Sequence, residues 1–576
     1  MAEKRPPGLA GGLTEYGDRE FAQYLRRSFA SAMGHTAQSL GKPVVGVLNT
    51  WSELNNCHRG LRELAEAVKR GVWQAGGLPL EFPVISLGEI FLSPTSMFLR
   101  NLMALDVEAM LRAQPLDAVV LMGGCDKTLP ALLMGAASAD VPAIVLAAGP
   151  MLTGSHEGER IGACTDCRRF WAAWRRGDLE RATIDDIEGQ LAPTAGTCGV
   201  MGTASTMACL SEAMGMMLPG GAAIPAVHAD RLRHGERSGI QAVALAHKRL
   251  KPSQIMTEAA FDNALRVLQA IGGSTNAVIH LTAIAGRLGI KLELDRLDAM
   301  ADSTPVLVGL KPSGAAYMED FHRAGGLPVV LQALRGQLHG DCLTVTGATL
   351  GEQLAGPFEW PDWQDVIRPP EDPLQEQGAL IALHGSLAPD GSVLKRSAAS
   401  PALLQSEARA VVFSSLTDLA ARIDDPALDV RPDDCLLLQN AGPLGGPGMP
   451  EVGYLPIPRK LTGQRDMLRI SDARMSGTAF GTIVLHVAPE AALGGPLGLV
   501  RSGDRVRLDA GRRHLDLLVD ERELLRRGEE ARHAAPLAPT ASRGYERLYR
   551  ESVQQAQLGV DFDFLRHESL QGETGK

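Results

Sequence analysis

Short apolar runs alternate with longer amphipathic ones from about residue 43, and this alternation constrains the fold more than any other feature of the chain. The runs PVVGVLN, EFPVIS, DAVVLM and PAIVLAA have the length and composition of strands, whereas LRELAEAVKRGVWQAG has helical periodicity. Strands that alternate with helices form a parallel sheet with helices on both faces. We therefore predict an α/β N-terminal domain with a doubly wound parallel sheet.

Polar residues follow these predicted strands directly. The loops are TWSELNNCHRG, LGEIFLSPTS and GGCDKTLP, and they carry Cys57, Glu89, Cys125, Asp126 and Lys127. Ligands of open α/β sheets bind at the carboxyl ends of the strands. We expect these five side chains to converge at one edge of the sheet.

A second domain is predicted after a Pro-rich polar stretch at 357–378. We place the boundary near 370, which gives domains 1–370 and 371–576. Beyond it, short apolar or alternating runs are separated by Gly, Pro and Asp turns, a pattern typical of a β-barrel-like domain flanked by helices. The charged last 50 residues are expected to form a surface helix and tail.

Composition excludes several classes of protein. The chain has 576 residues, with 57 Lys plus Arg against 67 Asp plus Glu, and no basic stripe with interleaved aromatics that would suit nucleic acid. No purely apolar run reaches the ~18 residues that a membrane span needs, and the N-terminus lacks a secretory apolar core. We expect a cytoplasmic protein without nucleic-acid or membrane partners, which binds small molecules or copies of itself.

Cysteines supply the first chemical signal. Eight cysteines are too sparse for a disulfide scaffold in a chain of this length. Cys57, Cys125 and Cys198 lie in loops flanked by Gly or Asn, and three thiolates can hold an iron-sulfur cluster with one iron open to substrate. The alternative is three buried cysteines that bind nothing.

A Cys-x-x-Cys pair, Cys164 and Cys167, is a competing signal for a redox pair or half of a zinc site. The chain contains no second pair to complete a zinc site. Arg168, Arg169 and Phe170 follow, so a loop or helix start near the active cleft is the preferred interpretation.

Hard oxygen ligands suited to Mg²⁺ are present on Glu89, Asp126 and Glu451. Each of them alone is equally consistent with a solvated surface charge. Lys127 follows Asp126 in an apolar setting, where burial is expected to lower its pKa and open the amine to modification, although a salt bridge is the default interpretation. A carbamylated Lys127 would be an anionic metal ligand.

The segment RISDARMSGTAFG presents Ser471, Asp472, Arg474, Ser476 and Thr478 in a Gly-punctuated turn. No G-x-S-x-G elbow occurs, which disfavours a hydrolase nucleophile. A serine acts as a base only where a nearby cation stabilises its alkoxide, as a Mg²⁺ site can do. The alternative is a serine that caps local backbone.

The chain resembles the dihydroxy-acid and phosphogluconate dehydratases, a family that includes sugar-acid dehydratases. The resemblance covers nearly the whole chain and rests on five ordered motifs: CDKTLPALLMG (125–135), PTAGTCGVMGTASTMACLSEAMG (193–215), GGSTNAVIHL (272–281), GPGMPEVG (446–453) and SDARMSGTAFG (471–481).

This resemblance implies roles for the matching positions. The implied ligands of a 2Fe-2S cluster, with 4Fe-4S as the alternative, are Cys57, Cys125 and Cys198, and those of Mg²⁺ are Glu89, Asp126, carbamylated Lys127 and Glu451. The implied catalytic residues are Ser476 as base, with Lys127 and Thr478. It also implies a homodimer or homotetramer with an active site between two domains.

The expected reaction removes water from a 2,3-dihydroxy acid to give a 2-keto-3-deoxy acid. GACTDCRRFWAAWRRGDL resembles the sugar-acid branch, which favours an aldonate such as L-arabinonate, D-xylonate or D-galactonate. No further basic cluster is apparent that would account for a phosphate. The alternatives are the dihydroxy-acid dehydratase of branched-chain amino-acid biosynthesis, a non-catalytic iron-sulfur sensor, and a zinc hydrolase that uses Cys164 and Cys167.

Overall fold

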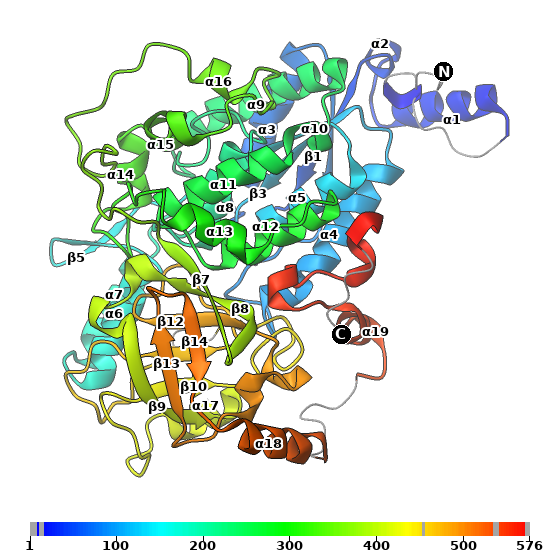
Figure 1. Cartoon of the computed structure of the whole chain (residues 1–576). Coiled ribbons are helices and arrows are strands. Elements are labelled where there is room, and N and C mark those ends of the chain that lie inside the picture. The colour runs from blue at the N-terminus through cyan, green and yellow to red at the C-terminus, as the bar shows by residue number, and fades with distance from the viewer. Residues whose placement is uncertain (1–7, 11–16, 452–454, 534–540, 571–576) are drawn as a thin grey trace.

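The computed structural model describes residues 8–10, 17–451, 455–533 and 541–570. Figure 1 shows an α/β part, coloured blue to green, above a β-barrel in yellow and orange. Within the described residues, no helix combines the length and apolarity that a membrane span requires.

Four parallel strands form the N-terminal sheet in the order β2-β1-β3-β4. They are β1 (Val44–Asn49), β2 (Leu78–Pro83), β3 (Ala118–Gly123) and β4 (Ala143–Ala147). Every residue of β1, β3 and β4 is buried, as expected for strands covered on both faces. The predicted parallel sheet is confirmed.

Helices α3 (Leu61–Gln74) and α9 (Ala229–Lys248) pack against each other and against this sheet. Two glycines permit their close approach. A Cβ added to Gly71 would lie 1.9 Å from the Glu236 carbonyl oxygen, and one added to Gly239 would lie 2.2 Å from the Val68 carbonyl oxygen. A second packed pair consists of α4 (Ser96–Ala113) and α5 (Thr128–Ala139).

A group of buried helices connects the sheet to the barrel. Every residue of α8 (Thr203–Ala213) and α12 (Asn276–Arg287) is buried, and α8 packs on α11 (Glu258–Ala270). The other α-helices of this part are α1 (Arg19–Ala32), α2 (Ala37–Leu40), α6 (Thr165–Arg176), α7 (Arg181–Gln190), α10 (Pro252–Ile255), α13 (Leu294–Ala301), α14 (Met318–Arg323), α15 (Leu327–Ala333) and α16 (Leu350–Gln353). A hairpin of β5 (Gly154–His156) and β6 (Glu159–Ile161) precedes α6.

The C-terminal part is a closed barrel in the order β10-β11-β12-β8-β7-β14-β13-β9. Its strands are β7 (Leu380–Gly385), β8 (Ala388–Lys395), β9 (Gln405–Phe413), β10 (Cys435–Leu438), β11 (Arg469–Ser471), β12 (Ile483–Ala488), β13 (Arg505–Asp509) and β14 (His514–Leu517). Helices α17 (Leu416–Arg422) and α18 (Glu521–His533) flank it. The predicted barrel-like domain with flanking helices is confirmed. The boundary near 370 lies in a segment without helix or strand and stays a prediction.

Two barrel strands were not predicted from the sequence. β8 reads APDGSVLK, and its Pro, Asp and Gly are residues of turns rather than strands. Gly391 indeed has φ +102°, and the pairing of β8 with β12 shifts register beside it. β11 is only three residues long, too short for a recognisable alternation.

The predicted exposed tail is partly wrong. Helix α19 (Gly544–Ser552) returns to the α/β part, where the red segment lies beside α4 in Figure 1. Tyr549 is fully buried with its ring 4.7 Å from that of Phe98. Arg287 pairs with Asp561 at 2.6 Å, and both side chains are fully buried. The C-terminal segment therefore completes the core of the first domain.

Candidate functional site

The loops after β1 and β3 meet at the point where the sheet order reverses. β1 and β3 are adjacent, although β2 lies between them in the sequence. This switch point is where open α/β sheets bind ligands. Cys57 follows β1 and Cys125 follows β3, and the Cys57 side chain lies close enough to raise the pKa of Cys125. The predicted convergence of these two residues is observed.

Cys198 joins them through backbone contacts. The Gly196 amide donates to the Asn56 carbonyl at 3.2 Å, which ties the Cys198 loop to the Cys57 loop. The Thr197 amide donates to the Gly149 carbonyl at 2.9 Å, just beyond β4. A cavity of about 200 Å³ is lined by Cys57 and Gly196. The three cysteine loops thus share one edge of the sheet.

His58 fixes the geometry of the Cys125 loop. Its Nε2 accepts hydrogen bonds from the amides of Gly124 at 3.0 Å and Cys125 at 3.2 Å, while its Nδ1 lies 2.8 Å from the Thr50 carbonyl oxygen. Burial lowers the pKa of His58 to about 4, so the ring is neutral. Its neighbour Cys57 was predicted as a ligand, but this supporting role was missed because no spacing pattern marks it.

The donor set fits a metal cluster. The pKa of Cys125 is raised well above its ordinary value by the hydrogen bond with Cys57, by burial, and then by the charges of Cys57 and Asp126. Buried thiols of this kind ionise poorly by themselves, and coordination to iron stabilises the thiolate. Cys125 Sγ also lies 3.5 Å from Asp126 Oδ1, so sulfur ligands adjoin the carboxylates.

Cys164 lies unexpectedly close to this group. Its Sγ is 2.9 Å from Cys198 Sγ, and the Cys167 thiol donates to the Cys164 carbonyl at 2.6 Å. Cys164 is the N-cap of α6, as expected for a helix start near the cleft. A fourth thiol is therefore within reach of the predicted cluster ligands.

The three predicted carboxylate ligands of Mg²⁺ surround two buried cations, Lys127 and Arg474. Lys127 Nζ forms ion pairs with Asp126 and, at 3.3 Å, with Glu89 Oε2. Arg474 reaches Glu89 Oε1 at 3.0 Å and Glu451 Oε1 at 3.2 Å. All four predicted metal residues are brought together, with Glu451 and Arg474 contributed by the barrel domain.

Burial and the two cations shift the pKa values of Glu89 and Glu451 in opposite directions. Burial raises the pKa of Glu89, but the charges of Lys127 and Arg474 outweigh it, so the pKa lies well below its ordinary value. Burial raises the pKa of Glu451 above its ordinary value, and the same two cations compensate only in part. Carboxylate oxygens in this incompletely neutralised setting suit a divalent hard cation.

Lys127 forms the salt bridge that is its default interpretation, whereas the lower pKa expected from burial is not observed. Burial lowers the pKa of Lys127, but Asp126, Glu89 and Glu451 outweigh burial and the repulsion of Arg474, so the pKa is raised. The structure thus contains an ion-paired ammonium rather than the activated amine expected from burial alone. Carbamylation stays a prediction.

The ligand atoms are more widely spread than in a compact one-ion site. Among the described residues, three His, Cys, Asp or Glu ligand atoms come within 4.8 Å of one another only at His228, Asp230 and His322, on the surface. Arg474 lies between Glu89 and Glu451, and Lys127 between Glu89 and Asp126, which separates the predicted ligands. Asp230 of the surface group already pairs with Arg233.

Ser476 lies where the two domains meet. Its Oγ accepts hydrogen bonds from the Thr478 hydroxyl at 2.9 Å and the Thr478 amide at 3.4 Å. A Cβ on Gly477 would lie 2.5 Å from Ser274 Cβ, and one on Gly202 would lie 3.1 Å from Thr478 Cγ2. Gly202 is the N-cap of α8, and Ser274 lies just before α12. The loop therefore packs against the N-terminal ends of two buried helices.

Two residues of the same motif have structural roles. The Ser471 hydroxyl accepts from the Ala473 amide at 3.0 Å. Asp472 is fully buried and accepts from the amides of Ala441 at 2.9 Å and Ala491 at 3.0 Å. These hydrogen bonds shape the turn.

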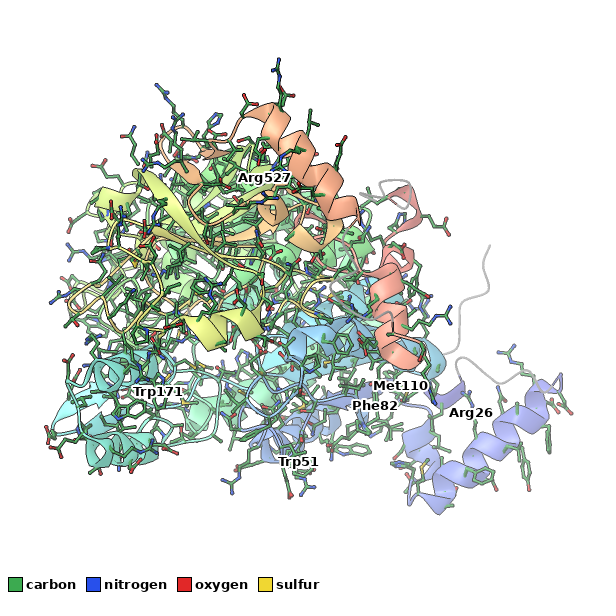
Figure 2. The ribbon with its side chains drawn as sticks, turned by 90° about the horizontal axis from the view of Figure 1, so that it is seen from below. Arg26, Trp51, Phe82, Met110, Trp171 and Arg527 are labelled. Carbon is green, nitrogen blue, oxygen red and sulfur yellow. The ribbon has the colours of Figure 1, made fainter. Side chains whose placement is uncertain are left out.

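A basic cavity that was not predicted adjoins this loop. It measures about 630 Å³ and is lined by six arginines, together with Phe480: Arg169, Arg175, Arg176, Arg459, Arg465 and Arg469. Carboxylates neutralise much of this charge, for example Asp424, which pairs with Arg175 at 2.8 Å and Arg459 at 3.2 Å. Figure 2 shows Trp171 on α6, the helix that supplies one wall. The sequence does not reveal this cluster, because its arginines come from segments far apart in the chain. The expectation that no basic cluster accounts for a phosphate stays a prediction.

The predicted site residues come together where the α/β domain and the β-barrel domain meet. The N-terminal family model of the dihydroxy-acid/6-phosphogluconate dehydratases matches residues 42–353, and the C-terminal model matches residues 365–560. The chain belongs to this family and is therefore a dehydratase, a hydro-lyase.

Individual relatives cover nearly the full length. The chain is 50% identical to the L-arabinonate dehydratase of Rhizobium leguminosarum bv. trifolii (strain WSM2304) over 91% of each protein. It is 48% identical to the 6-deoxy-6-sulfo-D-gluconate dehydratase of Pseudomonas putida, over 92% of this chain and 91% of that protein. Identity to the dihydroxy-acid dehydratase of Caldicellulosiruptor bescii is 38%, over 94% of this chain and 98% of that protein.

Proposed function

We propose that this chain removes water from a sugar acid with hydroxyls on C2 and C3, an aldonate such as L-arabinonate, D-xylonate or D-galactonate, and forms the 2-keto-3-deoxy acid. The observation that carries the proposal is the difference in identity between relatives. The chain is 50% identical to an L-arabinonate dehydratase but 38% identical to a dihydroxy-acid dehydratase, at similar coverage. Branched-chain amino-acid biosynthesis is accordingly the less favoured alternative.

Two inorganic groups belong to the proposal. Cys57, Cys125 and Cys198 would hold an iron-sulfur cluster, with 2Fe-2S favoured over 4Fe-4S, and Glu89, Asp126, Lys127 and Glu451 would surround Mg²⁺. The contact of Cys57 with Cys125 and the partly compensated charge of Glu451 support these assignments. When bound, such groups supply Lewis acidity to the substrate carboxylate and to the departing C3 hydroxyl.

The side chains of the protein would carry the proton transfer. Ser476 Oγ takes the proton from C2, and the C2–H electron pair forms the C2=C3 double bond as the C3–O bond breaks. The C3 hydroxyl leaves as water with the proton that Ser476 took from C2, which restores the serine alkoxide, and the enol tautomerises to the 2-keto acid. Thr478 donates two hydrogen bonds to Ser476 Oγ, which stabilise the alkoxide that a serine base requires.

Anaerobic purification with iron and sulfide analysis, followed by a 2-keto acid assay with Mg²⁺, tests the proposal. The acids to compare are L-arabinonate, D-xylonate, D-galactonate, D-gluconate and 2,3-dihydroxyisovalerate. A 6-sulfonated and a 6-phosphorylated gluconate belong in the same panel, because the arginine-lined cavity adjoins the Ser476 loop. Preference for an unsubstituted aldonate supports the proposal, whereas preference for dihydroxyisovalerate moves the enzyme to amino-acid biosynthesis.

Other outcomes separate the remaining alternatives. An intact cluster without turnover on any of these acids would favour a non-catalytic iron-sulfur sensor. Zinc in the purified protein, with activity after iron removal, would favour a hydrolase that uses Cys164 and Cys167. We further propose a cytoplasmic homodimer or homotetramer, which cell fractionation and light scattering on the holoenzyme test.

A further inference from the structure

Lys395 is a buried cation at the end of β8, and it has no place in the mechanism above. Its exposed fraction is 7%, and its ammonium donates to the Gly477 carbonyl at 3.3 Å. Across the part of the chain that the structure describes, no carboxylate forms an ion pair with it. Because burying an ammonium without a countercharge is costly, a lysine at this position needs a compensating role.

The carbonyl that Lys395 contacts belongs to the same peptide unit as the Thr478 amide. That amide donates to Ser476 Oγ at 3.4 Å. A cation on the carbonyl oxygen polarises the peptide and strengthens the hydrogen bond that its N–H donates. Lys395 therefore acts on the serine oxygen through one intervening peptide.

The peptide is held from its other side as well. Gly477 packs so tightly against Ser274 that an added Cβ would come within 2.5 Å of Ser274 Cβ. The strand end beyond Lys395 is anchored to the α/β domain, where Ser397 Oγ lies 3.1 Å from Ser313 Oγ. A fixed peptide between a fixed lysine and the serine is suited to orienting a hydrogen-bond donor.

We propose that Lys395 is a positioning residue for Ser476, whose ammonium orients and polarises the Gly477–Thr478 peptide so that its N–H stabilises the serine alkoxide. This inference rests on the proposed function, in which Ser476 is the base. Lys395 belongs to the barrel domain and is not one of the predicted metal ligands, so its effect on Ser476 is separate from theirs.

The charges around Lys395 agree with this role. Burial lowers the pKa of Lys395 to about 7. The residue of β7 that pairs with Lys395 is the apolar Leu380. The next residue, Arg396, donates to the Gly378 carbonyl. In the serine loop, Arg474 is paired with Glu89 and Glu451. A negative serine oxygen would thus be the countercharge that Lys395 lacks.

The test compares the wild-type holoenzyme with Lys395→Met, which keeps the volume and removes the charge. We expect kcat to fall by at least about tenfold with KM within about twofold, because the donor to the alkoxide is weakened. The acidic limb of the pH profile of kcat should also move to higher pH, since loss of a nearby cation raises the pKa of Ser476. An unchanged kcat, or a uniform loss with the limb unmoved, would overturn the proposal.

Two further variants keep the result interpretable. Lys395→Gln removes the charge and retains a donor, and it should show the same displaced limb even if Lys395→Met fails to fold. Arg396→Met, the matched neighbour, should keep the wild-type limb. If the wild-type enzyme turns over and the acidic limb is unmoved in both Lys395 variants, only the role of Lys395 is rejected. If the wild-type enzyme turns over none of the acids, the proposed function is rejected.

Discussion

Arg474 Nη2 lies 3.0 Å from Glu89 Oε1, a contact between side chains 385 positions apart in the sequence. The same guanidinium contacts Glu451. Gly88 directly precedes Glu89, and the segment GPGMP directly precedes Glu451. Arg474 is fully buried. The barrel loop that carries Ser476 is thereby tied to the carboxyl end of the parallel sheet.

Glu451→Gln tests the carboxylate group. Loss of one charged oxygen ligand should raise the Mg²⁺ concentration for half-maximal activity by at least about tenfold, which corresponds to about 1.4 kcal/mol or more. Mg²⁺ titration of activity, together with calorimetric Mg²⁺ binding, measures this. Glu53→Gln, an exposed carboxylate in the Cys57 loop, is the control and should match wild type. If Glu451→Gln and Glu53→Gln need the same Mg²⁺ concentration for half-maximal activity, Glu451 is not a Mg²⁺ ligand.

Cys198→Ser and Cys164→Ser distinguish a three-cysteine from a four-cysteine cluster. Their sulfurs are 2.9 Å apart, so the two variants perturb the same place. We expect Cys198→Ser to lose most of the iron and the visible absorption, and Cys164→Ser to keep both. Iron and sulfide per chain after anaerobic purification decide the matter. Loss of iron in Cys164→Ser would show that the open coordination position is absent.

Ser476→Ala should lower kcat by at least about 100-fold, the usual contribution of a general base, while iron content and Mg²⁺ binding stay at wild-type values. Thr478→Val removes one of the two donors to Ser476 Oγ and should cost about tenfold. Ser414→Ala, at an exposed serine beside β9, is the control. A Ser476→Ala enzyme that retains its full rate would refute the assignment of the base.

Stability should depend on pH through Lys395. Its folded pKa, about 7, lies below the ordinary value of 10.5 that applies when unfolded. The unfolded chain therefore binds more protons between these values, and this contribution makes the folded state more stable as pH rises from about 7 to 10.5. At pH 7 and below, Lys395→Met should be the more stable protein, by up to about 4 to 5 kcal/mol.

Thermal unfolding of both proteins across this range measures the effect. The difference in Tm should be largest near pH 7 and should approach zero above pH 10.5. A Tm difference that does not change with pH would show that Lys395 is not a depressed, buried ammonium.

The fold was largely predictable where local composition agrees with the final environment. β1, β3 and β4 are continuous apolar runs because both faces of the sheet are covered, and the loops with Cys57 and Cys125 follow from strand order. β8 was missed because its residues favour turns and only pairing with β7 and β12 makes it a strand. The strand conformation of β8 depends on pairing with strands distant in sequence, which the local sequence does not reveal.

The candidate site was predictable only in its ligand types. His58, Lys395 and Cys164 act through contacts that bring distant segments together, such as Lys395 with Gly477, 82 positions away. Burial alone would lower the pKa of Lys127, but Asp126, and then Glu89 and Glu451 from other loops, raise it. Burial can be inferred from an apolar sequence, but the charges that oppose it depend on the tertiary fold.

We propose that this dehydratase acts on a sugar acid at the junction of its two domains. The most direct measurement is the product that the anaerobically purified holoenzyme forms from L-arabinonate with Mg²⁺, identified by NMR and mass spectrometry. We expect the 2-keto-3-deoxy acid, lighter than the substrate by one water, from the wild-type enzyme and none from Ser476→Ala. Unchanged L-arabinonate with an intact cluster, alongside rapid dehydration of 2,3-dihydroxyisovalerate, would contradict this proposal.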